Sequence, residues 1–255
     1  MTFKVCIPAR LGSTRLPGKV LLDIGGRPMV QWVIEAALRS AADEVVVATD
    51  DERVATQALD KDGRNYAQLT RSDHPSGSDR IAEVATLRGW SADTIVVNVQ
   101  GDEPLLPPVL IDQVAGLLQS HPQAHIATLS TPIHSIDDFL DTNVVKVVRA
   151  WDHRALYFSR APIPWHRSGA GADLQSQRSY DGAQRHLGIY AYRVAALQAL
   201  TQILPTVLEQ AEKLEQLRAL ESGMQIVVEQ ARAVPGPGVD TEHDLQRART
   251  LLAGN

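Results

Sequence analysis

Residues 5–19 read VCIPARLGSTRLPGK, and this stretch sets the fold that we expect for the rest of the chain. A short β-branched run opens it, and the loop that follows holds two glycines, two hydroxyl side chains and the cations Arg10, Arg15 and Lys19. Glycine-rich loops at the carboxyl end of a first strand bind phosphates, because backbone N–H groups and positive charges point at the anion. We therefore expect a polyanion to bind at these three cations. The alternative is a solvated basic loop.

The same loop does not fit the P-loop pattern. That pattern has four residues between its glycines and a hydroxyl residue after the lysine. Here five residues separate Gly12 from Gly18, and Val20 follows Lys19. The hydroxyl that binds magnesium in a P-loop is therefore missing, so a metal ion would need carboxylates from elsewhere in the chain.

Helix and strand patterns alternate after this loop. Residues 28–40 are apolar and helix-forming, 44–49 form a β-branched run, a second helical stretch reaches about residue 59, and a strand pattern covers 66–70. This order favours an α/β fold with a doubly wound, mostly parallel sheet. In such sheets, ligands bind in the crevice at the carboxyl ends of the strands.

Residues 94–99 form the clearest buried strand, and they lead directly into Gln100, Gly101 and Asp102. Mg²⁺ favours one or two carboxylates together with substrate phosphates. Because Asp102 would lie at the mouth of the same crevice as the basic loop, we expect it to bind Mg²⁺. The alternative is an ordinary turn before Pro104.

Asp240 is the second candidate for a metal ligand. It follows the last predicted strand, 225–230, and two Pro-Gly pairs. From there it is placed either to cap the final helix, which we expect to reach about residue 253, or to reach the metal. Thr241 with Asp244 has the residues to supply that cap without Asp240.

The polar residues between 71 and 80 have two interpretations. Ser76, with Asp79 three residues later, has the spacing of a helix cap. Arg71 and Ser78 also lie where the end of a strand would meet a base or a ribose. The pattern favours neither interpretation for the hydroxyl groups.

The composition of the chain changes at about 140–195, which we interpret as an inserted mixed-sheet lobe within a single domain of residues 1–255. A long polar loop, 168–184, lies inside it and is typical of a mobile segment or a lid. Arg160, His186 and Tyr190 fall in this lobe, and the last two share one face of a predicted strand. Groups of this kind would suit an acidic sugar, although each alone is more often a surface or packing residue.

Residues 205–220 predict one further helix. It carries Glu209, Glu212, Glu215 and Gln216. By its charge pattern alone this is a solvated helix face.

The overall composition is that of an ordinary globular protein of 255 residues with a formal net charge of -5. The negative net charge gives no indication of nucleic-acid binding, and no apolar run is long enough to cross a membrane. Cys6, the only cysteine, sits in the first apolar run, so we expect it to be a small buried hydrophobe. We expect a cytoplasmic enzyme.

Several motifs, taken together, resemble one known family. They are PAR at 8–10 with STRLPGK at 13–19, VNVQGDEP at 97–104, YFSR at 157–160, RHLGIY at 185–190, LEQLR at 214–218 and GVDT at 238–241. In this order they are similar to the 3-deoxy-manno-octulosonate cytidylyltransferases, also called CMP-Kdo synthetases. The first motif alone is typical of the wider sugar nucleotidyltransferase superfamily.

The resemblance implies a nucleotide-diphospho-sugar transferase-like fold and transfer of CMP from CTP to the anomeric hydroxyl of Kdo, for lipopolysaccharide synthesis in the cytoplasm. It also implies a homodimer joined through the inserted lobe. By the same resemblance, Asp102 and Asp240 would coordinate Mg²⁺ and, with Arg10 and Lys19, form the catalytic set. The remaining roles it implies are the nucleotide site (Arg10, Ser13, Arg15, Lys19, Arg71, Ser78, Gln100) and the sugar site (Arg160, His186, Tyr190, Glu215, Gln216).

Other functions stay open at this point. The acidic sugar could be sialic acid or an 8-amino Kdo analogue, and a more distant relative would act on a sugar 1-phosphate. A non-catalytic nucleotide-binding sensor would keep the basic loop, but binding alone does not need two metal carboxylates.

Overall fold

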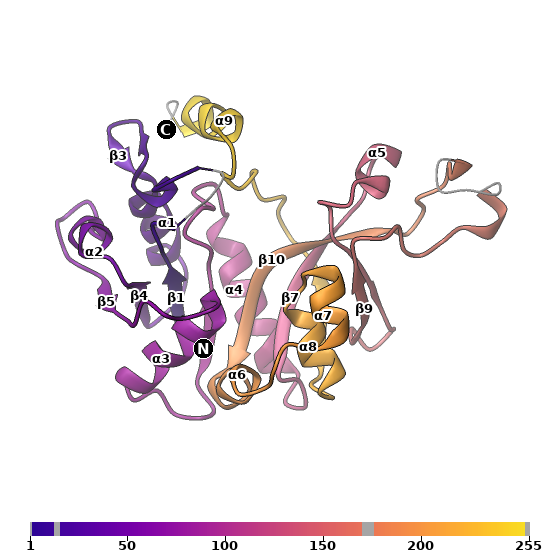
Figure 1. Ribbon diagram of the computed structural model, residues 1–255, viewed down its shortest axis with the longest axis horizontal. Helices are drawn as coiled ribbons and strands as arrows, with labels where there is room; N and C mark the ends of the chain where they lie inside the picture. Colours follow the sequence, from indigo (N-terminus) through magenta and orange to yellow (C-terminus); the bar gives the residue numbers. More distant parts are fainter. Residues whose placement is uncertain (1, 13–15, 170–175, 253–255) are drawn as a thin grey trace.

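A central β-sheet forms the core of the structure, a computed structural model that describes residues 2–12, 16–169 and 176–252. Its order is β11-β7-β10-β6-β1-β4-β5, with β8 beside β10 and β9 beside β8. Figure 1 shows these strands in the middle of the molecule. The strands are β1 (Lys4–Pro8), β4 (Glu44–Thr49), β5 (Ala67–Leu69), β6 (Ile95–Asn98), β7 (Ile126–Pro132), β8 (Lys146–Arg149), β9 (Ala155–Ser159), β10 (Gln184–Arg193) and β11 (Ile226–Gln230).

The strand directions place the functional loops at one edge of the sheet. β1 is parallel to β4 and β6, β4 is parallel to β5, and β7 is parallel to β11. β10 runs antiparallel to both β6 and β7, so these two strands also share a direction. The carboxyl ends of β1, β6 and β7 therefore lie at the same edge, which is where ligands bind in α/β sheets.

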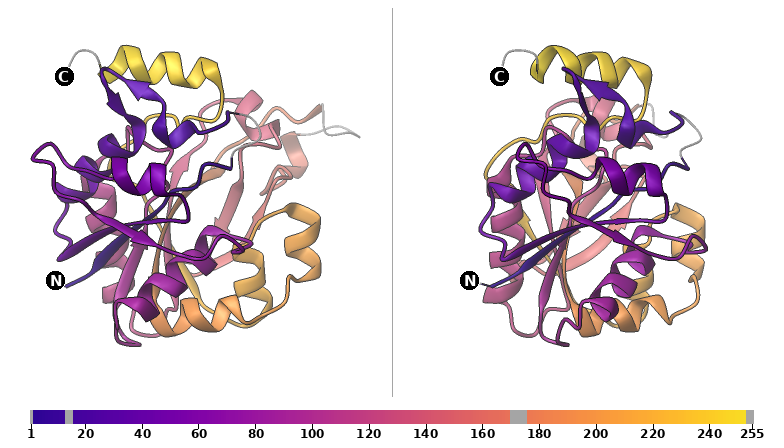
Figure 2. Two further views of the ribbon diagram at one scale, coloured as in Figure 1. Left: turned by 60° about the vertical axis from the view of Figure 1, so that its left-hand side comes forward. Right: turned by 90° about the vertical axis from the view of Figure 1, so that its left-hand side faces the viewer.

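Helices cover both faces of the sheet because successive strand residues point to opposite sides. Val5 and Ile7 belong to one apolar cluster, with α1 (Met29–Leu38), α2 (Glu52–Gln57) and α4 (Pro108–Ser120). Cys6 is fully buried, as predicted, in a second cluster on the other face, with α3 (Gly77–Leu87), α6 (Val194–Thr201) and α8 (Gln216–Glu221). Figure 2 shows the two helical layers, and the α/β prediction is confirmed.

A small third cluster brings the two ends of the chain together. The hairpin of β2 (Asp23–Ile24) and β3 (Arg27–Pro28) packs with α9 (Glu242–Leu252) through Ile24, Val239 and Leu245. Figure 1 shows α9 beside this hairpin, to its right. The loop before α9 is thereby held beside the 3₁₀ turn Lys19–Leu21 of the first loop.

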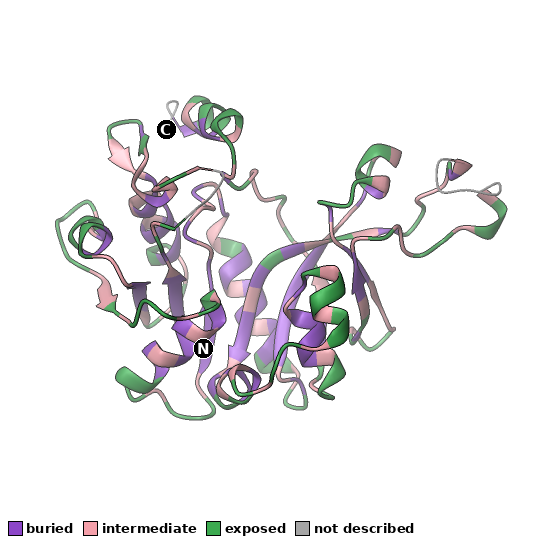
Figure 3. Cartoon of the chain, in the orientation of Figure 1, coloured by how far each residue is buried: buried purple, intermediate pink, exposed green. Residues whose placement is uncertain are grey.

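The lobe extends the same sheet. Strands β8 and β9 form a hairpin that pairs with β10, and α5 (Ile136–Leu140) contributes Phe139 to a separate apolar cluster with Ala183. The connection between β9 and β10, described at 160–169 and 176–183, reaches away from the sheet and is largely exposed or partly exposed (Figure 3). Among the described residues, no helix is both long and apolar enough to cross a membrane.

Residues 205–220 form two helices, so the prediction of one helix is wrong. α7 (Val207–Glu212) ends at Lys213, which adopts a left-handed conformation with φ 55°, and α8 then begins after Glu215. The predicted solvated face is also wrong, because Glu209 and Glu215 both pair with Arg218.

Candidate active site

Lys19, Asp102 and Asp240 meet at the carboxyl edge of the sheet. Gly18, with φ 66°, turns the chain into the 3₁₀ turn that begins at Lys19, while Asp102 follows β6. The Lys19 Nζ donates one hydrogen bond to Asp102 Oδ2 and a second, at 3.0 Å, to Asp240 Oδ1. Three residues predicted for catalysis from distant parts of the sequence therefore share one ionic cluster.

The backbone before α9 delivers Asp240 to this cluster. The N–H of Val239 donates to the Asp102 carbonyl at 2.9 Å, and the Val239 side chain is fully buried. Asp240 was considered either as the helix cap or as a metal ligand. The cap is made instead by Thr241 and Asp244, whose side chains bond each other at 2.7 Å. The Asp244 N–H donates to Thr241 Oγ1 at 3.2 Å, which completes the cap.

Gly101 allows the turn after β6 to lie against the end of β1. A Cβ at this position would come 3.0 Å from the Pro8 carbonyl oxygen, a backbone atom that cannot rotate away. Glycine at this position therefore lets the turn that carries Asp102 pass close to the end of β1.

The charges in the cluster support one another. Partial burial opposes the ammonium form of Lys19, but Asp102 and Asp240 outweigh it and raise the pKa of Lys19. Next to them, burial and the two aspartates raise the pKa of Glu103 to about 7. Glu103 lies against Gly188 and Gly238 and lines a cavity of about 340 Å³ with Arg185 and His186.

The two aspartates fit a magnesium ion that arrives with phosphates. In the described part of the chain, no three His, Cys, Asp or Glu side chains form a complete metal cluster. Mg²⁺ does not require one, because it takes one or two carboxylates and completes its shell with substrate phosphates and water. The ammonium of Lys19 already shows that both carboxylates can face a single cation.

Arg10 and Gln100 line a second cavity, of about 120 Å³, next to this cluster. Ser76 and Gly77 at the start of α3 also line it. Ser76 caps α3 by accepting the Asp79 N–H at 3.3 Å, which is one of the two interpretations that the sequence left open for it. The structure thus brings Arg10 and Gln100 together, in a cavity that backbone N–H groups at the start of a helix can supplement.

The other residues predicted to bind the nucleotide lie outside this cavity or outside the described residues. Arg71 is exposed, pairs with Asp73 at 2.6 Å and lines a neighbouring cavity of about 540 Å³. Ser78 is buried, and its hydroxyl donates to Glu215 Oε2 at 2.6 Å. Ser13 and Arg15 lie outside the described residues.

His186, Tyr190 and Tyr192 form an aromatic row along β10. The ring centroids lie 5.3 Å apart between His186 and Tyr190, and 5.7 Å apart between Tyr190 and Tyr192. The predicted common face of His186 and Tyr190 is therefore confirmed, across a register shift between Leu187 and Tyr190. Burial lowers the pKa of His186 to about 3, so its imidazole is neutral at pH 7 and contacts Thr128 Oγ1 at 3.0 Å.

Arg160 contacts the carboxyl-terminal end of α7, and Gln216 begins α8. The Arg160 guanidinium donates to the carbonyls of Glu212 at 2.7 Å and Thr142 at 2.9 Å, so it ties the lobe to the end of α7. Gln216 is buried at the first position of α8, directly after Glu215. Of the predicted sugar residues, His186 and Tyr190 are in contact, and Glu215 is close enough to add to the raised pKa of Tyr190 that burial causes.

Comparison with known proteins decides the family. The family model described as cytidylyltransferase matches residues 5–226. A 3-deoxy-manno-octulosonate cytidylyltransferase of Thioalkalivibrio sulfidiphilus is 55% identical over 252 residues, covering 99% of each chain. One from Aeromonas salmonicida is 52% identical and covers 99% of this chain and 100% of the relative. The chain belongs to the 3-deoxy-manno-octulosonate cytidylyltransferase family.

Solved structures agree with this assignment. A structure of CMP:2-keto-3-deoxy-manno-octonic acid synthetase complexed with CTP is 43% identical, with a TM-score of 0.86, and covers 99% of this chain and 98% of that one. A cytidylyltransferase structure from Leptospira borgpetersenii, 18% identical with a TM-score of 0.60, shares the fold. The mixed sheet is thus the fold of a 3-deoxy-manno-octulosonate cytidylyltransferase.

Sequence reasoning missed three residues of this 3-deoxy-manno-octulosonate cytidylyltransferase site. Glu103 could have been found, because it follows Asp102 directly and is a second acidic residue at the end of the same strand. Tyr192 alternates with Tyr190 on β10, which places both on one face. Arg218 gave no signal, because its inward position depends on the break at Lys213.

Proposed function

We propose that this protein transfers CMP from CTP to the anomeric hydroxyl of 3-deoxy-D-manno-octulosonate (Kdo), giving CMP-Kdo and pyrophosphate. The observation that carries the proposal is the cluster of Lys19, Asp102 and Asp240 at the carboxyl edge of the sheet, in a chain of this family. The product would supply lipopolysaccharide synthesis. We place the reaction in the cytoplasm, where CTP is made.

The reaction needs positioned charges more than covalent chemistry. The sugar oxygen attacks the α-phosphorus, the bond from that phosphorus to the bridging oxygen breaks, pyrophosphate leaves, and the hydroxyl proton passes to solvent. Arg10 and Lys19, with Ser13 and Arg15 from the same loop, would hold the triphosphate and spread its charge. Such preorganised positioning and electrostatic stabilisation account for most of the catalysis in phosphoryl transfer.

Mg²⁺ is part of the proposal, with Asp102 and Asp240 as its protein ligands. The bound ion would neutralise phosphate oxygens and so stabilise negative charge in the transition state. Lys19 would then exchange its carboxylate partners for phosphate oxygens. Its flexible side chain permits this movement, and the phosphate oxygens would replace the carboxylates as the anions that favour its cationic form.

The sugar would bind beside the aromatic row. The neutral His186 can exchange hydrogen bonds with sugar hydroxyls, and Tyr190, Glu215 and Gln216 lie along the same side of the sheet. Arg160 would meet the sugar carboxylate from the lobe. The relatives at 51–55% identity carry the Kdo name, so sialic acid and the nucleotide sensor are not favoured.

A homodimer joined through the lobe completes the proposal. Large apolar side chains are exposed on the lobe at Trp151, Leu156 and Trp165, with exposed fractions of 104%, 53% and 42%. Burying such side chains against a second copy would stabilise association. Light scattering after size-exclusion chromatography should give about twice the monomer mass; a monomer at micromolar concentration would remove this part of the proposal.

The sugar assignment is tested by identifying the product. We expect ³¹P NMR of protein, Mg²⁺ and CTP to show a CMP-sugar diester and pyrophosphate when Kdo is added. Parallel samples would contain sialic acid, an 8-amino Kdo analogue, or UTP in place of CTP. A diester formed faster from sialic acid or the 8-amino analogue than from Kdo would reopen the sugar assignment and leave the cytidylyltransferase assignment intact.

A further inference from the structure

Arg218 is a nearly buried cation with an unusually complete set of partners. Its side chain is 9% exposed, and its guanidinium binds the Glu209 carboxylate through two bonds of 2.9 Å and 2.7 Å. It also donates to the Ile203 carbonyl at 3.2 Å. A paired contact of this kind fixes the orientation of the guanidinium as well as its position.

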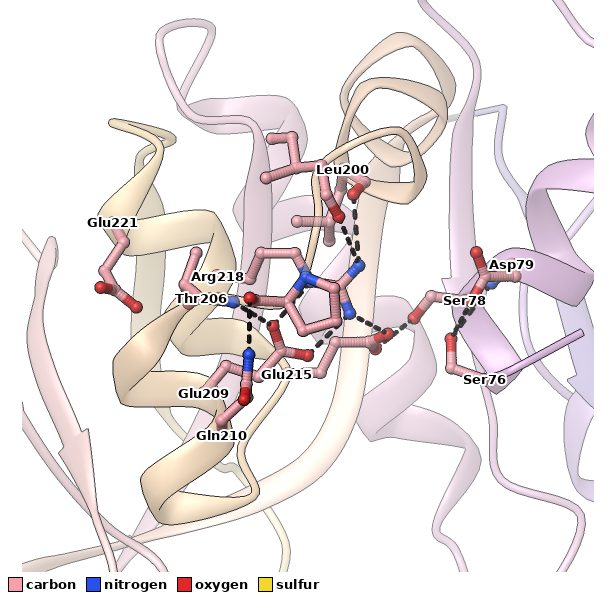
Figure 4. Close-up of polar contacts among 12 residues, drawn as sticks. Ser76, Ser78, Asp79, Leu200, Thr206, Glu209, Gln210, Glu215, Arg218 and Glu221 are labelled. Carbon is pink, nitrogen blue, oxygen red and sulfur yellow. Dashed lines mark hydrogen bonds and ion pairs between the residues drawn. The ribbon is translucent and has the colours of Figure 1, made fainter.

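The same guanidinium reaches Glu215, one of the predicted sugar residues. Glu215 directs one carboxylate oxygen, Oε1, to Arg218 at 3.3 Å and the other, Oε2, to the Ser78 hydroxyl at 2.6 Å (Figure 4). Both oxygens therefore have a donor, one from each side. With χ angles free to rotate, a glutamate lacking one of these donors would lose this single orientation.

The two residues that donate to Glu215 lie on different helices, Ser78 on α3 and Arg218 on α8. Ser78 lies in the first turn of α3, next to Ser76 and Gly77 of the Arg10 cavity, whereas Arg218 lies in α8 and is anchored to α7 by Glu209. Glu215 also acts on the phenols of the aromatic row: together with burial it raises the pKa of Tyr190 and Tyr192. Glu215 is thus held between the Arg10 cavity and the aromatic row.

We propose that Arg218 is a positioning residue for the sugar substrate: by holding Glu215 against Ser78, it fixes the carboxylate that the sugar meets. The proposal rests on the proposed function, because Glu215 must face the sugar. It assigns Arg218 no contact with substrate. Lysine at this position would keep the charge but lose the paired geometry toward Glu209.

The test measures KM for Kdo, KM for CTP and kcat by pyrophosphate release in wild type and Arg218→Lys. We expect KM for Kdo to rise about tenfold, the effect of losing one charged hydrogen bond, while KM for CTP changes less than about twofold. In a Glu215→Gln background, Arg218→Lys should have no further effect on KM for Kdo, because the residue through which it acts is already changed.

Arg193→Lys is the matched control. Arg193 is half-buried and, like Arg218, donates to main-chain carbonyls, of Ala124 at 3.0 Å and Leu118 at 3.2 Å, but at the amino-terminal ends of β6 and β7. It should lower the melting temperature and leave both KM values unchanged. If Arg218→Lys does the same, Arg218 is merely structural and the inference is overturned.

Ser78→Ala keeps the inference falsifiable if Arg218→Lys does not fold. It removes the other donor to Glu215, so KM for Kdo should again rise, and again without effect in the Glu215→Gln background. An unchanged KM for Kdo in Ser78→Ala would contradict the inference. If wild type releases no pyrophosphate with Kdo, the proposed function fails and the inference with it; active wild type with an unchanged Arg218→Lys variant overturns the inference alone.

Discussion

Asp102 and Asp240 accept hydrogen bonds from the same ammonium group, the Nζ of Lys19, although one follows the central strand β6 and the other precedes the last helix. The two carboxylates are therefore held around one cation before any substrate is bound. Two carboxylates that can face one cation suit a divalent metal ion. Such an ion takes one or two carboxylates and completes its coordination with phosphates and water.

Asp102→Asn should lower turnover at least ~10²-fold, the size of the loss when a preorganised charge-stabilising group is removed. The measurement is kcat for pyrophosphate release at saturating CTP and Mg²⁺. Asp112→Asn is the control: Asp112 lies on α4 and accepts the Ala41 N–H at 2.8 Å, a bond that asparagine can keep. Near-normal turnover of Asp102→Asn at saturating Mg²⁺ would contradict the assignment of Asp102 as a catalytic metal ligand.

Asp240→Asn and Asp244→Ala should have opposite effects, although they lie in the same turn. Asp244 completes the cap of α9, so its change should lower the free energy of unfolding by about 1 kcal/mol and leave turnover nearly intact. Asp240→Asn should weaken Mg²⁺ dependence and turnover with little loss of stability. Urea unfolding and Mg²⁺ titrations of the rate distinguish them. The reverse pattern would return Asp240 to a capping role.

Gly101→Ala should destabilise the protein by about 1–3 kcal/mol, because its Cβ would come 3.0 Å from the Pro8 carbonyl oxygen. It should also lower activity, since Asp102 would move away from Lys19. Gly12→Ala, where nothing lies within 4 Å of the new Cβ, is the control for stability. Equal midpoints for the two variants in urea unfolding would mean that the close approach of β1 and the β6 turn is not required.

His186 should make the protein less stable as the pH falls. Burial lowers its pKa to about 3 in the folded protein, and in the unfolded chain it is near the ordinary value of 6.5. Between these values only the unfolded state binds the proton, so stability is complete above pH 6.5 and decreases toward pH 3. By pH 5 the loss should be about 2 kcal/mol.

His186→Gln should remove this part of the pH dependence, and His243→Gln, at an exposed position on α9, should not. Free energies of unfolding from urea titrations at pH 7.5 and pH 5 provide the comparison. Parallel pH curves for wild type and His186→Gln would show that folding leaves the pKa of His186 unchanged, which would contradict the lowering of that pKa by burial.

The sheet and the catalytic edge were predictable because they depend on local patterns. The apolar run at 94–99 gives β6, and the residues that follow it, Gly101 and Asp102, lie at the edge expected for a parallel strand. Lys19 was recognisable from charge and glycine content. Nothing in these patterns gives the pairing of Lys19 with both aspartates, which depends on the packing of α9 against β2.

The sugar side was less predictable because tertiary contacts override local pattern there. Glu209 and Glu215 look solvated on a single helix, but the left-handed Lys213 breaks that helix and folds α7 back onto Arg218. A non-glycine residue with positive φ has no clear sequence signal. Ser78 likewise has the position of a ligand-binding hydroxyl, yet it bonds to Glu215 from α3.

Pyrophosphate release by the purified protein with Mg²⁺, in the presence and absence of CTP and Kdo, tests the central claim most directly. We predict release that requires both CTP and Kdo, falls at least ~10²-fold in Asp102→Asn, and is not supported by UTP with Kdo or by CTP with sialic acid. If CTP binds but neither Kdo nor any other acceptor yields pyrophosphate, the account of this site as a cytidylyltransferase centre is contradicted.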